Sequence, residues 1–402
     1  MNHDHIPAPP HLSLPALFGK FLRFGCLAFG GPVAQIAMVK QKLVVEEGWI
    51  TPQRFNRLLA VMQVLPGPEA HELCVHMGMI ARGRIGGLLA GLGFMLPGFL
   101  LMLACGFAYA SYIEGRGGVD SVLLGVQVAV LAVIARAVQR IGAHILTSGW
   151  LWALAVLGAG ATLADVPFWV PLIAAAYAYA KEDKPAARIL LAAIAVAAAY
   201  FLLPAEVPVS IALEANGTIT QAALAALFMA GLKGGLLTFG GAYTAIPYVR
   251  ADTVAQGWLS DGQFLDGVAI ANVLPAPLVI FATFAGFMAA GVPGALAITA
   301  GMFLPAFAFS MIFFERLEAL VDNARLHRTL DGIAAAVVGI IAATLLQLGA
   351  AVLARLPGGE SDLIWAAPVF ALALLAAFLV KGGWVAPAIL AAGGAAGWLV
   401  FA

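Results

Sequence analysis

The sequence predicts an all-α polytopic membrane protein built from two inverted structural repeats. Three observations lead to this fold class: an apolar composition, a long internal repeat, and a bias in the positions of Lys and Arg. Of the 402 residues, 62% are hydrophobic and 10% are charged, whereas soluble domains contain about 45–50% apolar and about 25% charged residues. A soluble protein must cover its surface with polar groups, so this composition excludes a soluble enzyme.

The composition and the pattern also exclude other classes of protein. The net charge is zero and no basic cluster is present, which argues against disorder, a coiled coil and nucleic-acid binding. Stretch 189–203 is apolar on every face, whereas the strands of a membrane β-barrel alternate apolar and polar side chains. Cys26, Cys74 and Cys105 lie singly in apolar stretches, so we expect no disulfide, no metal site and no cofactor.

Residues 1–13 form a polar lead. This lead contains no Lys or Arg and no small-residue cleavage site, so it does not resemble a secretory signal. His3, His5 and His11 could hold a metal loosely, but a solvated tail is the favoured interpretation. We expect this N-terminal end to be cytoplasmic.

The internal repeat relates two copies that lie about 209 residues apart. The offset drifts from 210 to 208, which requires two single-residue gaps. Repeats of this kind are typical of membrane transporters. The matching motifs are Phe29-Gly30-Gly31 with Phe239-Gly240-Gly241, Trp49-Ile50-Thr51 with Trp258-Leu259-Ser260, Leu65-Pro66-Gly67-Pro68 with Leu274-Pro275-Ala276-Pro277, and Leu96-Pro97 with Leu304-Pro305.

Each copy begins with apolar pieces that are too short to span a bilayer, which takes about 20 residues. Gly and Pro break helices, so we interpret FGGP, LPGP and their second copies as the tips of re-entrant or broken helical hairpins. Spanning helices follow the hairpins in each repeat. The expected pieces are 14–29, 33–46, 52–65, 69–81, 86–112, 119–138, 149–164, 168–180 and 189–203, then 221–249, 262–289, 294–314, 330–353, 362–379 and 384–401. The expected domains are 14–203 and 221–402, joined by a periplasmic linker at 204–220.

Lys and Arg are enriched in cytoplasmic loops. Fifteen of the 21 basic residues fall on one predicted side, and Arg116, Arg250 and Arg355 fall on the other. The hairpin loop at 47–57 is basic and its counterpart at 250–266 is not, which predicts that the two repeats are inverted. An odd number of crossings must then separate them. Stretch 149–180 can be read either as one broken span or as two.

The four tips should meet near the midplane of the membrane and form an anion site, because each begins a new helix with unpaired N–H groups. The alternative is that Gly and Pro merely allow close helix packing. The residues that we expect at this site are Gly30, Gly31, Pro32, Pro66, Gly67, Pro68, Gly240, Gly241, Pro275 and Pro277, together with two basic residues.

Arg23 and Lys233 are these basic residues. Each precedes its glycine tip by seven residues, or two helical turns, which places it on the face that leads to the tip. A basic residue at mid-membrane costs about 2.5–3.5 kcal/mol on insertion scales. We expect each half to supply one positive charge to a shared anion site. The alternative is a structural contact to a carbonyl or to a carboxylate such as Glu69.

Glu69, Glu72 and His76 are spaced to share one face of the helix that starts at LPGP, while His71 points nearly opposite. The second copy has apolar residues at the equivalent positions. The helix dipole favours a charged Glu69 and burial favours a protonated one, so these residues are candidates for proton coupling. The alternative is that Glu69 caps its helix and pairs permanently with Arg23.

The ordered motifs FGGP, Trp49-Ile50, LPGPEA, Gly86-Gly87 and LPG, with the degenerate copies FGGA and LPAP, make the chain resemble the chromate ion transporter family, in its long two-domain form. The resemblance implies a carrier of the bacterial inner membrane that expels chromate, a tetrahedral dianion, by ion-coupled efflux. It also implies that Arg23, the FGGP glycines and the LPGPEA segment are needed for transport. Its expected partners are the oxyanion, with sulfate as a second candidate, and the lipid bilayer; a homodimer is left open, and no nucleic acid is expected.

Two other functions compete with this one. A passive anion channel would share the positive tips without needing proton carriers. An intramembrane enzyme acting on lipid-linked phosphate could use the same hairpins, with Glu69, Glu72 and His76 as acid–base groups. Such an enzyme would need a phosphate-gripping Ser or Arg at a tip, and the tips hold Gly, Pro and Ala.

Overall fold

The computed structural model describes residues 9–62, 66–113, 119–180, 185–202, 221–239, 241–312, 324–380, 382 and 384–401. Within these ranges the chain is helical and contains no strand. The first half contains α1 (Leu14–Cys26), α2 (Gly31–Val39), η1 (Lys40–Glu46), α3 (Pro52–Met62), α4 (Glu69–Ala108), η2 (Tyr109–Ile113), α5 (Asp120–Ile145), α6 (Gly149–Leu163), α7 (Trp169–Tyr179) and α8 (Pro185–Leu202). The second half contains α9 (Gln221–Leu236), η3 (Ala242–Ala245), α10 (Ile246–Thr253), α11 (Asp261–Val273), η4 (Leu278–Ile280), α12 (Phe281–Ile312), α14 (Ala324–Leu353), α15 (Glu360–Leu379) and α16 (Val385–Val400).

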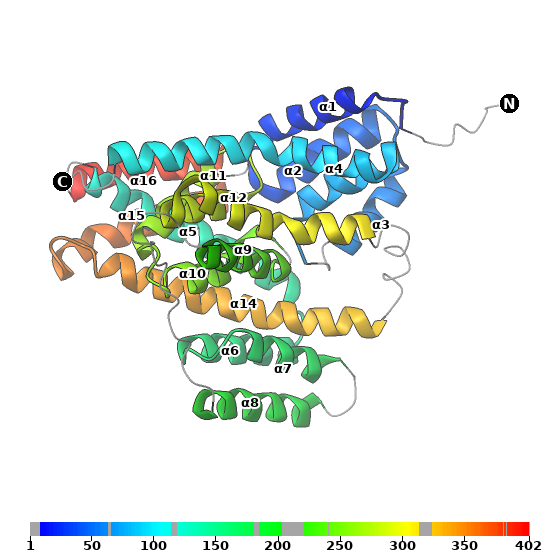
Figure 1. Cartoon of the computed structure of the whole chain (residues 1–402). Coiled ribbons are helices and arrows are strands. Elements are labelled where there is room, and N and C mark those ends of the chain that lie inside the picture. The colour runs from blue at the N-terminus through cyan, green and yellow to red at the C-terminus, as the bar shows by residue number, and fades with distance from the viewer. Residues whose placement is uncertain are drawn as a thin grey trace.

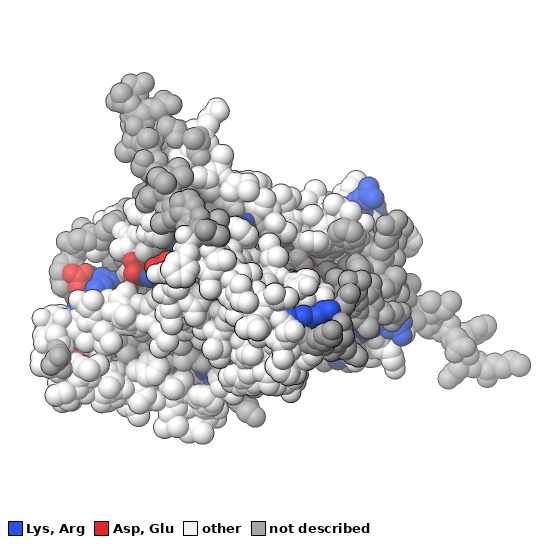
Figure 2. All heavy atoms as spheres, turned by 90° about the horizontal axis from the view of Figure 1, so that it is seen from below, with Lys and Arg blue, Asp and Glu red and all other residues white. Residues whose placement is uncertain are grey.

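Five stretches of the described chain are long and apolar enough to cross a membrane: Glu69–Ile113, Asp120–Ile145, Leu278–Ile312, His327–Leu353 and Ser361–Leu379. In the last of these, 11% of the most apolar window is buried inside the protein, so this apolar helix faces outward. Figure 2 shows that one face of the molecule is largely free of charged side chains wherever its atoms are described. These features confirm the predicted all-α polytopic membrane protein.

The chain breaks its helices at FGGP, LPGP, FGGA and LPAP, as predicted. Helix α1 ends at Cys26 and α2 begins at Gly31, with Gly30 at φ 86° and Gly31 at φ 76°. Such positive φ values suit glycine, which has no Cβ to clash with the backbone. In the first half both breaks lead directly into α-helices, whereas in the second half a 3₁₀ turn, η3 or η4, comes first.

The long helices α4 and α12 each fold back on themselves at a two-residue turn. Arg82 and Gly83 have φ/ψ of −145°/28° and 61°/−155°. The corresponding values for Ala290 and Gly291, 208 residues later, are −151°/31° and 57°/−151°. In each case glycines on either side of the turn face one another, Gly78 with Gly86 and Gly286 with Gly294. The two halves therefore repeat the same helical hairpin in their backbone geometry.

The helices before the first breaks pack on these hairpins in equivalent ways. Gly25 of α1 lies against the Phe94 carbonyl of α4, and Gly235 of α9 lies against the Met302 carbonyl of α12. The two hairpins also contact each other directly through α4 and α12. The LPGP and LPAP breaks lie in the interior of the molecule, and the FGGP break is partly exposed.

The stretch 149–180 forms two apolar helices, each shorter than the five long stretches above. Helices α6 and α7 are joined by a turn in which Asp165 has φ 54°, and both pack along α14, with α8 outside them (Figure 1). The hydrophobic clusters do not follow the repeat boundary. One cluster runs from Leu17 to Phe94, and the other joins α5–α8 to the second half. The predicted linker at 204–220 lies wholly outside the described residues, which resume at 221.

Candidate functional site

The structure brings the four helix breaks together. Gly67 of LPGP donates its backbone N–H to the Thr238 carbonyl beside FGGA, over 2.8 Å. The Gln35 amide Nε2 donates to the Ala28 carbonyl beside FGGP at 2.9 Å and to the Ala276 carbonyl of LPAP at 2.8 Å. All four breaks contribute to a cavity of about 10 Å³, close to the smallest space that holds a water molecule. It is lined by Pro32, Gln35, Pro68, Glu69, Ala70, Gly241, Ala242, Pro277 and Leu278.

Gln35 is the residue that connects these breaks, and sequence reasoning missed it. Its side chain is 1% exposed. A buried amide must find hydrogen-bond partners, and the carbonyls freed by the breaks supply them. The signal in the sequence was a lone glutamine within the apolar run Val33–Ile36. Of the predicted break residues, Pro32, Pro68, Gly241 and Pro277 line this small cavity, and Gly240 falls outside the described residues.

A larger cavity of about 550 Å³ lies beside the FGGP break. Its polar lining consists of the break itself, Arg136 and Arg140 of α5, Tyr243 of η3 and Asn272 of α11. The Tyr243 hydroxyl donates to Asn272 Oδ1 at 2.7 Å. The rest of the wall is apolar and comes mainly from α2, α15 and α16. Its size is typical of a small-ligand site.

The two arginines of this cavity are the main functional candidates that the sequence analysis did not assign. The predicted helix ends at residue 138, with both arginines counted on the cytoplasmic side, whereas α5 continues to Ile145. Arg136 stacks over the Phe378 ring at 4.3 Å and donates to Gln139. Arg140 is exposed to the cavity, and its charge acts on Glu69 and Tyr243. The available signal was their four-residue spacing, which places both on one helix face.

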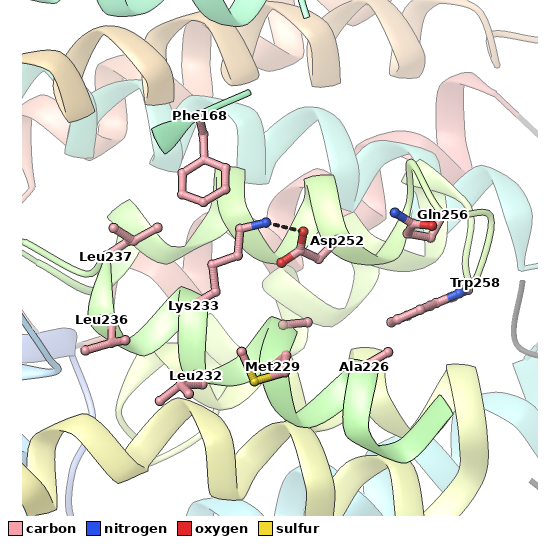
Figure 3. A pocket seen from close by; sticks show the side chains of 11 residues that line it. Phe168, Ala226, Met229, Leu232, Lys233, Leu236, Leu237, Asp252, Gln256 and Trp258 are labelled. Atoms are coloured by element: carbon pink, nitrogen blue, oxygen red, sulfur yellow. Dashed lines mark hydrogen bonds and ion pairs between the residues drawn. The ribbon is translucent and has the colours of Figure 1, made fainter. Parts of the chain in front are cut away.

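Lys233 lies at a different place. It lines a separate cavity of about 480 Å³, where its ammonium pairs with Asp252 at 2.6 Å and sits 4.1 Å from the centre of the Phe168 ring (Figure 3). Arg23 is exposed on α1 and acts electrostatically on Lys42. The structure therefore does not bring Arg23 and Lys233 into one cavity, and the expectation of a shared two-charge site is corrected. The reason is that each side chain projects outward from a helix whose inner face packs on a hairpin.

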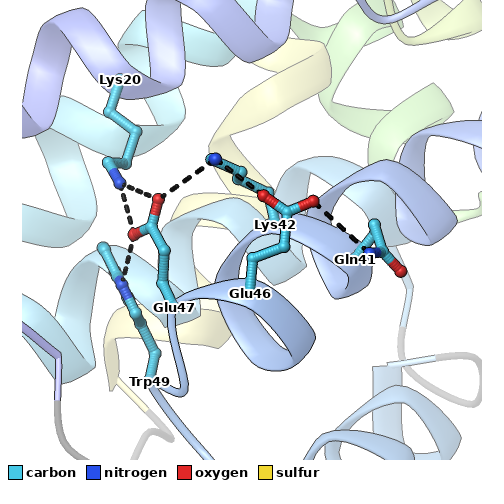
Figure 4. A network of polar contacts seen from close by, with 6 residues as sticks. All are labelled: Lys20, Gln41, Lys42, Glu46, Glu47 and Trp49. Atoms are coloured by element: carbon cyan, nitrogen blue, oxygen red, sulfur yellow. Dashed lines mark hydrogen bonds and ion pairs between the residues drawn. The ribbon is translucent and has the colours of Figure 1, made fainter.

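The internal repeat shows which residues of the two halves correspond to Lys233 and its ion-pair partner. Lys233 and Asp252 correspond, at an offset of 210, to Arg23 and Lys42. The second half thus has an ion pair where the first half has two cations. In the first half, Lys42 instead pairs with Glu46 at 2.8 Å, and Lys20 pairs with Glu47 (Figure 4). Glu47 also accepts from the Trp49 indole at 2.9 Å. Lys20 and Lys42 are thus both held by carboxylates of the same short segment.

The carboxylates at the start of α4 are buried. Glu69 is 8% exposed and Glu72 is 1% exposed. Neither carboxylate oxygen of Glu72 has a hydrogen-bond partner among the described residues. The Glu72 carboxyl lies directly against Gly67, where a side chain would collide with it. The charge of Arg140 acts on Glu69, and that of Glu69 acts on Glu72, so Arg140 replaces Arg23 as the cationic neighbour of Glu69.

The two histidines of α4 are also enclosed. His76 is 2% exposed, as expected for the buried face. His71, expected to point nearly opposite to Glu69, is fully buried as well, with its ring 4.9 Å from Phe303 and 4.8 Å from Phe307. Both phenylalanines belong to α12, so His71 packs at the contact between the two hairpins. The start of α4 is therefore surrounded by protein on all sides.

Comparisons with known proteins agree with this architecture. The family model described as "Chromate transporter" matches residues 15–219 and 225–398. The chain is 52% identical to the "Chromate transport protein" of Pseudomonas aeruginosa, covering 98% of this chain and 94% of the relative. It is 31% identical to the "Probable chromate transport protein" of Synechococcus elongatus, covering 87% and 88%. It is also 30% identical to the "Chromate transport protein" of Cupriavidus metallidurans, covering 84% and 83%. No solved structure matches the chain significantly.

Proposed function

Because this chain belongs to the chromate transporter family, we propose that it carries chromate out of a bacterial cell across the inner membrane, with sulfate as a competing substrate. It is a multi-pass membrane transporter rather than an enzyme. We further propose that its N-terminal end is cytoplasmic and that transport is coupled to an ion. A homodimer is the proposed assembly, to be checked by native mass spectrometry of the purified protein.

The observation that carries this proposal is the meeting of four helix breaks at one place inside the protein. Gln35 and the Gly67–Thr238 hydrogen bond hold the breaks together. Backbone groups freed at a break can face a ligand rather than lipid. Helix α2 starts at the FGGP break, so its first N–H groups and the positive end of its dipole lie at the cavity wall. This favours an anionic substrate.

The inverted arrangement of the repeats is part of the proposal. The matched turns at Gly83 and Gly291 support a repeat, and the opposite charge of the two hairpin loops supports inversion. Two inverted halves around one site can alternate by rocking against each other. The direct contact between α4 and α12 provides the surface along which such movement would occur.

Glu69, Glu72 and His76 are the proposed coupling residues. They are buried at the LPGP break, and Glu69 also borders the small cavity that all four breaks share. Arg140 links Glu69 to the larger cavity, because its charge acts on Glu69 and its side chain lines the cavity. A proton at Glu69 and an anion beside Arg140 would therefore influence each other. Arg23 and Lys233 remain candidate transport residues at two separate places.

The substrate is tested by competition in proteoliposomes that contain the purified protein. Uptake of radiolabelled chromate should exceed that of protein-free vesicles and should fall when unlabelled chromate or sulfate is added. Molybdate tests whether a larger tetrahedral dianion is accepted. Chromate uptake equal to that of empty vesicles, in either direction of an imposed pH gradient, would contradict the proposed function.

A further inference from the structure

We propose that Arg136 and Arg140 bind the transported oxyanion directly, as a pair of guanidinium groups on one face of α5. The inference rests on the proposed function, because it assigns the ligands of the substrate that the transporter carries. It names as substrate class a tetrahedral anion with two negative charges.

The first support is the spacing of the two side chains. Residues four apart on a helix have Cβ atoms about 5–6 Å from each other, and both arginines line the cavity of about 550 Å³. Like charges at this spacing destabilise a helix when nothing lies between them. A guanidinium presents N–H groups in a fork that matches two oxygens of an oxyanion. One anion can therefore bridge the pair and remove the repulsion.

The second support is the charge balance of the cavity wall. Arg136 and Arg140 are the charged residues among its described lining, which contains no carboxylate. Arg140 has no hydrogen-bond or ion-pair partner in the described part of the chain, although its charge acts on Glu69. A wall with two positive charges is matched by a dianion, and a monoanion would leave one charge unneutralised.

The third support comes from elements other than α5. Gly30, Gly31 and Pro32 bring the start of α2 to the same cavity. Gly30, at the N-cap of α2, offers no side-chain hydrogen bond to the first N–H groups, which are therefore free to face an anion. On another wall, the Phe378 ring of α15 stacks on the Arg136 guanidinium at 4.3 Å. This contact, together with the hydrogen bond from Arg136 to Gln139, holds the guanidinium at the cavity wall.

A purely structural role for the arginines makes a different prediction. Cations near the C-terminal end of a helix interact favourably with its dipole, and Arg140 lies five residues before the end of α5. If this were their whole role, replacing either arginine would change stability and leave anion affinity unchanged. Anion affinity therefore separates the two roles.

The test is isothermal titration of sulfate and of chromate into the purified protein in lipid nanodiscs. The variants are Arg136→Gln, Arg140→Gln and Arg140→Lys, and the matched control is Arg57→Gln, an exposed arginine of α3 outside the cavity. Each Gln variant should bind sulfate roughly ten- to a hundredfold more weakly, the usual loss for one charged hydrogen-bonded contact. Arg140→Lys should keep part of the affinity if charge dominates, and Arg57→Gln should bind as the native protein does.

Perchlorate, a tetrahedral monoanion, measures the charge preference. The native protein should prefer sulfate to perchlorate, and the double variant Arg136→Gln/Arg140→Gln should lose this preference. Sulfate affinity within twofold of the native value in monodisperse Arg136→Gln and Arg140→Gln would overturn the assignment of the two arginines. Chromate transport by the native protein would then still support the proposed function. Absence of any oxyanion binding or transport by the native protein would overturn both. Should one Gln variant fail to fold, the other Gln variant provides the same comparison with Arg57→Gln.

Discussion

At the scale of single residues, the protein concentrates its buried polar groups where the helix breaks meet. Gln35 holds two of the breaks through carbonyl oxygens, and Glu72 is enclosed without a hydrogen-bond partner in the described structure. Burying a carboxyl group without a partner is costly, which makes Glu72 a candidate for a group that works during transport. Glu69 is the more accessible of the two carboxyls at this place.

Glu69→Gln removes a titratable proton and preserves the shape of the side chain. Its charged neighbours are Glu72 on the same helix and Arg140 on α5, and the other residues that line the small cavity carry no titratable group. If Glu69 carries the coupling proton, the variant should lose transport driven by a pH gradient and keep exchange of one anion for another. Both are measured in proteoliposomes, with Glu46→Gln, an exposed carboxyl of η1, as the matched control. Gradient-driven transport with unchanged pH dependence in Glu69→Gln would assign this residue a structural role.

At the scale of elements, the positions of the helix breaks were predictable from the sequence, and the lengths of some helices were not. Gly and Pro marked the four breaks, because these residues act through local backbone geometry. The gap between the expected pieces 69–81 and 86–112 coincides with the fold-back of α4 at Arg82 and Gly83. The end of α5 was misplaced because Gln139 and Arg140 interrupt an apolar run. Sequence periodicity cannot show that a polar helix face borders a cavity built by α2, α15 and α16. The same limitation concealed Arg136 and Arg140 as candidate ligands and suggested that Arg23 and Lys233 meet.

The fold-back turns give a prediction about stability. Gly83 and Gly291 have φ near 60° with ψ near −150°, a region that glycine occupies almost exclusively and that costs other residues about 1–3 kcal/mol. Gly83→Ala and Gly291→Ala should therefore each lower the free energy of unfolding by about that amount, and by similar amounts because their dihedrals match. Denaturant unfolding of the purified native protein and of each variant measures this change in the free energy of unfolding.

Gly19→Ala is the matched control, because a Cβ there meets nothing within 4 Å and Gly19 lies inside α1 with no positive φ. It should be neutral or slightly stabilising, since alanine favours a helix more than glycine does. Loss of stability in the control and none at Gly83 and Gly291 would contradict the turn geometry.

At the scale of the whole molecule, the sequence repeat and the packing units differ. The sequence divides near residue 210, but the larger hydrophobic cluster combines α5–α8 with the second half, and the smaller one runs from Leu17 of α1 to Phe94, beyond the fold-back of α4. The repeat could be found because its motifs are local. The packing units depend on contacts between distant helices, such as α14 with α6 and α7, which no local pattern specifies.

Inversion of the repeats is tested by the sidedness of four loops. Single cysteines would replace Gln53, Arg84, Ala255 and Val292, all exposed, after removal of the native cysteines. A membrane-impermeant thiol reagent should label positions 53 and 84 from the cytoplasmic side and positions 255 and 292 from the periplasmic side. Labelling of all four from the same side would contradict the inverted repeat.

The central claim is that two halves form one oxyanion site that is exposed alternately to the two sides of the membrane. Counterflow tests it most directly, in proteoliposomes loaded with unlabelled chromate and diluted into a trace of labelled chromate, with the membrane potential clamped. A site that alternates should concentrate the label transiently inside the vesicles, because each outward passage of unlabelled chromate returns the site for inward passage of label. Label that equilibrates without any overshoot, at a rate independent of the internal chromate, would show a passive channel and contradict the account.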